Sequence, residues 1–183
     1  MSGGPRFVVI TGRPGVGKTT IFSRVVERLR SGGCRVVGFV CPEVRVGGRR
    51  VGFRIRSLDG GMEAWLAHVS LCSGGRVGRY RLCSEAARVA EYVAGLFSEA
   101  DVIAIDEIGP MELRMPAVRN VILKAIGAGK PGLFVVHRRL SDPEIYPVLR
   151  REGVWFWVTL ENRDALPDRV YTEVARIAPC IKG

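Results

Sequence analysis

The stretch RFVVITGRPGVGKTTIFSRVVERL, residues 6–29, decides the fold class of this chain. It begins with a short apolar run, and it ends with apolar residues spaced as on one helical face: Ile21, Phe22, Val25, Val26 and Leu29. Between the two, residues 12–19 fit the pattern G-x-x-x-x-G-K-[ST]. Because the pattern follows a predicted strand and opens a predicted helix, it predicts a phosphate-binding loop.

The residue types of this loop explain how it would hold a polyphosphate. Glycines let backbone N–H groups point inward, and the helix N-terminus adds partial positive charge. Lys18 is expected to reach the β- and γ-phosphates, and the Thr19 hydroxyl to ligate Mg²⁺. We therefore expect nucleotide contacts from Gly12, Arg13, Pro14, Gly15, Val16, Gly17, Lys18, Thr19 and Thr20.

Further short apolar runs continue the pattern along the chain, at residues 35–41, 101–106, 132–137 and 154–159. Runs of this kind are typical of parallel strands that are buried on both faces. Helical stripes alternate with them, at residues 21–29, 89–97 and 118–126 and near the C-terminus at Val170, Val174 and Ile177. The alternation predicts a three-layer α/β sandwich with a mostly parallel central sheet, formed by one P-loop domain over residues 1–183.

Two segments add detail to this pattern. Ser141-Asp142-Pro143-Glu144 has capping-box spacing, so a helix is expected to start there and to end near Gly153. Residues 43–69 alternate apolar and basic positions around two glycine turns, which predicts an antiparallel hairpin insertion. The arginines of this insertion suit a solvated face, a basic flap over triphosphate or a nucleic-acid groove: Arg45, Arg49, Arg50, Arg54 and Arg56.

A second acidic motif follows the apolar run Val102-Ile103-Ala104-Ile105. Asp106 is expected to orient the Mg²⁺ shell, so Thr19 and Asp106 are the predicted metal residues. Glu107 emerges where open α/β sheets place their ligands, and it could polarise a water aimed at the γ-phosphate. The alternative is an acidic turn after a core strand, which the phosphate loop upstream makes the weaker reading.

The chain resembles the nucleoside-triphosphatases first recognised in thermophiles, a family that includes the human cancer-related nucleoside-triphosphatase. The segments that carry this resemblance are GRPGVGKTT at 12–20, GFVCPEVRVGGRRVGFRIRSLDG at 38–60, RVGRY at 76–80, IDEIGPMEL at 105–113, HRR at 137–139 and VTLENRD at 158–164. The segment at 38–60 discriminates best, because phosphate loops occur in many families. Cys41-Pro42 stands where family members often have small hydroxyl or acidic residues.

The resemblance implies a Mg²⁺-dependent enzyme that hydrolyses ATP, GTP and other nucleoside triphosphates to diphosphate and phosphate with little base preference. It also implies nucleotide contacts at residues 12–19 and 102–109. In the second segment residues 102–105 belong inside the sheet, so the contacts are expected from Asp106, Glu107, Ile108 and Gly109. Lys18 and Glu107 are then the expected catalytic residues.

Several residues beyond the strand ends keep alternative roles. An arginine that stabilises transition-state charge could be Arg138, Arg139 or Arg163, each just after a strand. We interpret His137 as a satisfied strand-end histidine. Asn162 and Asp164 suit either a base pocket or the cap of the last helix, and Trp155 and Trp157 are expected in the core.

Two other functions share parts of this pattern. A nucleotide or polynucleotide kinase has the same loop and Mg²⁺ site but transfers phosphate to a hydroxyl. A nucleotide-gated RNA-binding module is favoured mainly by the net charge of +10. Nucleoside triphosphates are the expected partners, with nucleic acid left open.

Composition sets the remaining expectations. No apolar stretch approaches the roughly 20 residues of a membrane span, and the N-terminus lacks the pattern of a secretion signal, so we expect a cytoplasmic monomer. Five cysteines form no Cys-x-x-Cys pair, and reduced, packed thiols are expected, with a Cys72–Cys83 bond left open. The chain has no Gln and two Asn, which favours a thermophilic source.

Overall fold

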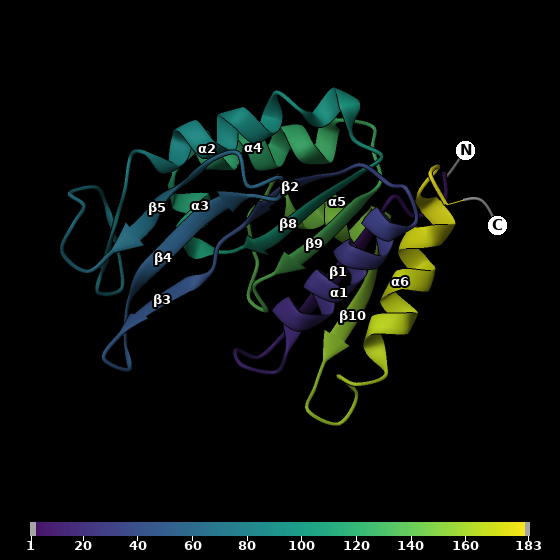
Figure 1. Ribbon diagram of the computed structural model, residues 1–183, viewed down its shortest axis with the longest axis horizontal. Coiled ribbons are helices and arrows are strands. Elements are labelled where there is room, and N and C mark those ends of the chain that lie inside the picture. The colour runs from purple at the N-terminus through teal and green to yellow at the C-terminus, as the bar shows by residue number, and fades with distance from the viewer. Residues whose placement is uncertain (1–2, 182–183) are drawn as a thin grey trace.

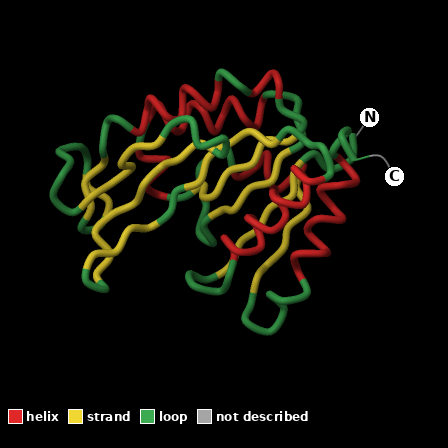
Figure 2. Tube along the Cα trace, in the orientation of Figure 1, coloured by secondary structure: helices red, strands yellow, loops and turns green. Residues whose placement is uncertain are grey.

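A ten-stranded sheet runs through the computed structural model, which describes residues 3–181, and helices cover both of its faces (Figures 1 and 2). Five strands are parallel to their neighbours within one half of the sheet. In spatial order they are β10 (Gly153–Val158), β1 (Phe7–Gly12), β9 (Gly132–Val136), β8 (Val102–Ile108) and β2 (Val36–Val40). Every predicted parallel strand is confirmed, and each boundary agrees within two residues.

The other half of the sheet is the antiparallel insertion. β4 (Arg49–Ser57) pairs with β2, and the order continues through β5 (Glu63–His68), β7 (Tyr80–Leu82) and β6 (Arg76–Val77). β3 (Glu43–Val46) forms a hairpin with β4. The predicted insertion is confirmed, while β6 and β7 were not predicted because they are too short to show a period.

Two apolar layers hold the helices onto the sheet. On one face, α1 (Lys18–Ser31) and α6 (Leu166–Ile177) pack over alternate strand residues such as Val8 and Ile10. The other face carries α2 (Ala86–Ala94), the 3-10 turn Phe97–Glu99, α3 (Pro110–Arg114), α4 (Pro116–Gly127) and α5 (Tyr146–Glu152). The helical stripes predicted from the sequence are the buried sides of α1, α2, α4 and α6.

The helix predicted to start at Ser141 begins later, at Tyr146. The Asp142 carboxylate accepts hydrogen bonds from the N–H groups of Glu144 and Ile145, at 3.0 and 3.2 Å, and it also pairs with Arg119. The capping-box residues therefore stabilise a turn that is tied to α4, and the helix starts only after that turn.

The expectation of reduced cysteines is wrong for four of the five. Cys34 is bonded to Cys180, and Cys72 is bonded to Cys83, with Cα–Cα distances of 5.2 and 5.0 Å. Cys41 keeps a free thiol. The first bond joins the end of α1 to the segment after α6, two places that are far apart in sequence but adjacent because both helices cover the same face.

Of the two tryptophans expected in the core, Trp155 packs against it and Trp157 does not. Trp157 is 54% exposed at the end of the edge strand β10, whereas Trp155 is partly buried and donates its indole N–H to the Leu149 carbonyl oxygen. No strand lies beyond β10 to cover Trp157 within residues 3–181. None of the helices in the same range has the length and apolar character that crossing a membrane requires.

Candidate active site

The candidate site lies at the carboxyl ends of β1, β9 and β8, which are adjacent in the sheet. Ile10 pairs with Val135, and Val135 pairs with Asp106. The loop after β1 and the acidic end of β8 therefore lie at the same edge of the sheet. In Figure 1 the arrowheads of β9 and β10 point toward the lower side, where the loop before α1 also lies. This is the edge at which open α/β sheets bind ligands.

The loop between β1 and α1 depends on three glycines with positive φ, namely Gly12, Gly15 and Gly17 (φ of 146°, 78° and 106°). Gly17 is the residue before α1, and a left-handed conformation there favours glycine. At Gly12 a Cβ atom would lie 2.6 Å from the Val158 carbonyl oxygen, so a side chain would collide with β10. The structure therefore explains the glycines of the sequence pattern.

Lys18 folds back over this loop. Its Nζ donates a hydrogen bond of 2.7 Å to the Gly12 carbonyl oxygen. The ammonium group thus lies beside the loop that would hold a polyphosphate. Around it the side chains of Arg13, Pro14, Thr19 and Thr20 are exposed, while Val16 is buried against the sheet.

Asp106 and Thr19 meet, as the metal prediction requires. Asp106 is only 7% exposed, and the Thr19 hydroxyl lies close enough to its carboxylate to lower its pKa. Burial raises the pKa of Asp106 to about 6, and the nearby charge of Glu107 adds to this. The Thr19 hydroxyl and the Lys18 charge act in the opposite direction. Mg²⁺ prefers oxygen ligands, and the Thr19 hydroxyl and the Asp106 carboxylate both offer them. These residues therefore fit that ion.

Glu107 has a neighbour that the sequence did not reveal. A Cβ atom on Gly109 would lie 2.7 Å from Oε1 of Glu107 and 3.4 Å from Oε2 of Glu112. Glu112, in α3, is 5% exposed, and burial raises its pKa to about 8, with Glu107 and Asp106 adding to the shift. The Cys41 thiol lies near it, and the Glu112 charge is one of the causes that raise the pKa of Cys41. Nothing in the sequence marks Glu112 as buried, because its helix is only one turn long.

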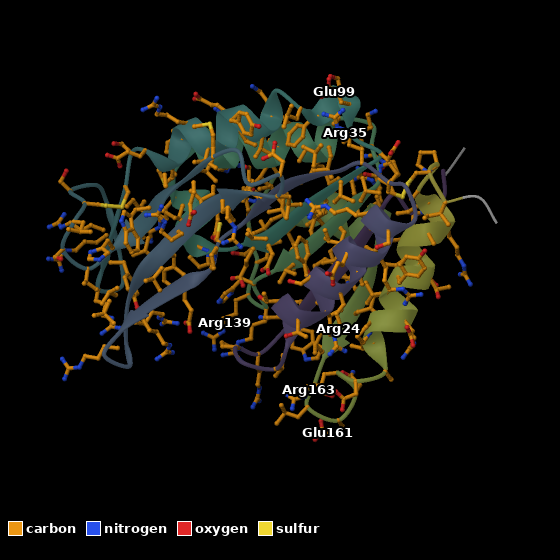
Figure 3. The ribbon with its side chains drawn as sticks, in the orientation of Figure 1. Arg24, Arg35, Glu99, Arg139, Glu161 and Arg163 are labelled. Atoms are coloured by element: carbon orange, nitrogen blue, oxygen red, sulfur yellow. A yellow bond between two sulfur atoms is a disulfide. The ribbon has the colours of Figure 1, made fainter. Side chains whose placement is uncertain are left out.

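The three candidate arginines occupy different places, and Figure 3 shows Arg139 and Arg163 on the side of the phosphate loop. A Cβ on Gly17 would lie 3.5 Å from Cδ of Arg163, so the Arg163 stem covers the loop. Arg139 is exposed and lines a cavity of about 250 Å³ with Gly109 and His137. Arg138 is partly buried, and its Nε is the buried side-chain donor that lacks a hydrogen-bond partner within residues 3–181.

Four other expectations can now be judged. His137 accepts a hydrogen bond from the Arg139 N–H at its Nδ1, which confirms the strand-end interpretation. Ile108 is corrected as a ligand contact, because its side chain is fully buried in the core. Asn162 closes the turn after β10 through Thr159 and Trp157, and α6 has no side-chain cap, so the capping interpretation of Asn162 and Asp164 is wrong.

The arginines of the insertion are divided between ion pairs and open surface. Arg45 and Arg50 both pair with Glu43, and Arg54 pairs with Glu63 and lies over the Trp65 ring. Arg56 is exposed. Hydrogen bonds from Arg45 lower the pKa of Glu43, so Glu43 is an anion committed to its own hairpin.

Known proteins resemble this chain over nearly its whole length. A family model described as NTPase matches residues 7–171. The nucleoside-triphosphatase THEP1 of Hyperthermus butylicus is 57% identical over 178 residues, covering 97% of this chain and 95% of that protein. The THEP1 protein of Ignicoccus hospitalis is 49% identical over 157 residues, covering 86% and 90%.

Solved structures agree with these relatives. The crystal structure of THEP1 from the hyperthermophile Aquifex aeolicus superposes with a TM-score of 0.76 at 29% identity, covering 92% of this chain and 98% of that one. The solution structure of a human cancer-related nucleoside triphosphatase gives 0.72 at 33% identity, covering 92% and 97%.

Proposed function

This chain belongs to the NTPase family and hydrolyses nucleoside triphosphates, and on that premise we propose how its residues carry out the reaction. The observation that carries the proposal is the meeting of Asp106 with Thr19 beside the glycine loop. Loop N–H groups and Lys18 bind the polyphosphate, since the Lys18 ammonium already lies over Gly12. A phosphate oxygen then replaces the Gly12 carbonyl oxygen as its acceptor.

The metal residues are proposed to be Thr19 and Asp106. Bound there, Mg²⁺ would neutralise charge that develops on the phosphate oxygens. Asp106 becomes an anion when a cation approaches, because the attraction offsets the burial that now raises its pKa to about 6. Thr19 is exposed at the start of α1, so its hydroxyl can turn from Asp106 toward the ligand.

Glu107 is proposed to activate the attacking water. It follows Asp106 on β8, at the edge where the γ-phosphate would lie, and its carboxylate accepts the proton that the water loses. The water oxygen forms a bond to the γ-phosphorus while the bond to the bridging oxygen of the diphosphate breaks. The products are a nucleoside diphosphate and phosphate.

Among the three arginines, Arg138 is proposed to stabilise the transition state. It follows β9, the strand between β1 and β8, and the Thr11 hydroxyl donates to the Val136 carbonyl oxygen two residues before it. A buried donor without a partner costs about 1–3 kcal/mol, so this guanidinium favours a rearrangement toward phosphate oxygens. Arg163 and Arg139 are proposed to contact the nucleotide away from the γ-phosphate.

Low base selectivity is also part of the proposal, because the contacts assigned above go to phosphate and metal. The test is phosphate release from ATP, GTP, CTP and UTP with Mg²⁺, without an acceptor, and again after EDTA treatment. We expect rates within about tenfold of one another, which corresponds to about 1.4 kcal/mol, and loss of activity in EDTA. A strict preference for one base, or full activity in EDTA, contradicts the proposal.

The alternatives of a kinase and an RNA-binding module gain no support from the relatives, which are named as nucleoside-triphosphatases. That the chain is one domain, monomeric and cytoplasmic stays a prediction.

A further inference from the structure

Glu112 is a buried carboxyl group that the mechanism above does not use. It lies in the first turn of α3 with 5% of its surface exposed. No arginine, lysine or histidine among residues 3–181 forms an ion pair with it. A buried carboxyl group without a cation is far more stable in its neutral form, and a neutral carboxyl group can donate a hydrogen bond.

Its position relates it to Glu107. The distances from the Gly109 Cβ position, 2.7 Å to Oε1 of Glu107 and 3.4 Å to Oε2 of Glu112, place the two oxygens no more than about 6 Å apart. A methyl group at residue 109 would collide with the Glu107 oxygen and contact the Glu112 oxygen. The glycine that joins β8 to α3 therefore lets the two carboxyl groups converge.

The groups that face Glu112 favour its neutral form, in which it can act as a hydrogen-bond donor. Glu107 and Asp106 approach from β8, and the Cys41 thiol lies near it after β2. The two acidic neighbours disfavour a negative charge on Glu112, and its pKa of about 8 agrees with a neutral group. In its neutral form the carboxyl group keeps one O–H group that can donate a hydrogen bond.

We propose that Glu112 is a positioning residue for Glu107, whose carboxylate it orients toward the attacking water by donating a hydrogen bond across Gly109. The inference rests on the proposed role of Glu107 and adds a residue that does not touch the substrate. A neutral acid that donates a hydrogen bond inside an active site is an established use of a raised pKa.

The first test compares Glu112→Ala with Glu112→Gln. The amide of Gln can donate as the neutral acid does, so we expect its kcat within about threefold of the natural protein. Ala removes the donor, and a misplaced catalytic group costs up to about 100-fold, so we expect kcat to fall about 10- to 100-fold. The KM and the affinity for Mg²⁺ with a non-hydrolysable triphosphate should change less than about threefold in both variants.

Glu99→Ala is the matched control. It also removes a carboxylate, but from the ion pair with Arg35 at the side of the molecule opposite the phosphate loop (Figure 3). We expect this variant to hydrolyse at the natural rate. Loss of kcat in Glu99→Ala equal to that in Glu112→Ala would show a general effect on stability, and it would overturn the proposal.

Gly109→Ala provides an independent test if Glu112→Ala folds poorly. The added methyl group displaces Glu107, so we expect the same fall in kcat with KM retained. The double variant Gly109→Ala/Glu112→Ala should be no slower than the slower single variant, because both changes disrupt the same placement of the Glu107 carboxylate.

Three further results would overturn the proposal: natural turnover in Glu112→Ala, equal loss in Glu112→Gln and Glu112→Ala, or losses that multiply in the double variant. The natural protein is measured beside them. If it releases no phosphate, the proposed function fails, whereas the inference fails only when the natural protein is active and the variants behave as just described.

Discussion

Lys18 is the residue on which triphosphate binding depends most directly. Its ammonium donates a hydrogen bond to the loop backbone, and Lys18 is not a member of the buried core. A hydrogen bond to a charged group contributes about 1.5–3 kcal/mol, so Lys18→Ala is expected to weaken triphosphate affinity about 10- to 100-fold. Isothermal titration with a non-hydrolysable triphosphate measures this.

Lys124→Ala on α4 is the control for that measurement, because Lys124 is exposed on the helix layer that packs against the opposite face of the sheet from α1. Unchanged affinity in Lys18→Ala would show that the polyphosphate does not bind in this loop. The midpoint of thermal unfolding is expected to stay close to that of the natural protein in both variants.

The neighbours Asp106 and Glu107 are expected to respond differently to loss of their charge. Glu107→Gln keeps the shape but removes the basic oxygen, so single-turnover hydrolysis should fall about 10²- to 10⁴-fold while Mg²⁺-ATP still binds. Asp106→Asn removes a negative charge from the metal shell and should raise the Mg²⁺ concentration that is needed for half-maximal rate.

Rapid-quench hydrolysis and a Mg²⁺ titration of both variants separate these effects. Near-natural hydrolysis by Glu107→Gln would reduce this residue to a strand-end carboxylate. Glu43, an acidic residue of the β3–β4 hairpin, is a poor substitute because it is held by Arg45 and Arg50.

At the scale of elements, the segment after β9 is where the structure adds most to what the sequence predicts. HRR at 137–139 places two adjacent arginines beyond a strand, and the sequence could not choose between them. Packing separates them, because one guanidinium is partly buried with an unpaired Nε while its neighbour is exposed.

Arg138→Ala is therefore expected to lower kcat by about 10³-fold or more, the usual contribution of a transition-state arginine. Arg139→Ala, with the same change of charge one residue later, should lower it by less than about tenfold. The informative measurement is affinity for nucleoside diphosphate with aluminium fluoride, which mimics the transition state. If Arg138→Ala binds this complex as tightly as the natural protein, the assignment is wrong.

At the scale of the whole molecule, the Cys34–Cys180 bond is the longest covalent constraint, closing a loop of about 146 residues. Loop-closure entropy predicts about 5 kcal/mol for it and about 3 kcal/mol for Cys72–Cys83, whose cysteines are 11 residues apart. Cys34→Ala/Cys180→Ala is expected to lower the midpoint of thermal unfolding by about 10–20 °C, more than Cys72→Ala/Cys83→Ala does.

Calorimetry of the oxidised protein checks this order. When reductant is added to the Cys34→Ala/Cys180→Ala variant, its midpoint of thermal unfolding should fall only by the contribution of the remaining Cys72–Cys83 bond. Equal midpoints for the natural protein and that variant would show that the bond does not stabilise the fold.

The sequence by itself determined the parallel strands, the helices between them, the glycine loop at 12–19 and the carboxylates at Asp106 and Glu107. These features are local: each depends on a period or a spacing within a few residues, and the sheet edge then brings them together.

Only the tertiary structure decided the burial of Glu112, the unpaired Nε of Arg138, the pairing of Cys34 with Cys180 and the exposure of Trp157. Each of these depends on which distant segments lie against a side chain. Glu112 is buried because α3 folds under the end of β8, and Trp157 is exposed because β10 is the last strand of the sheet. Burial and partnership arise from contacts between residues far apart in sequence, and no local pattern of residue types records them.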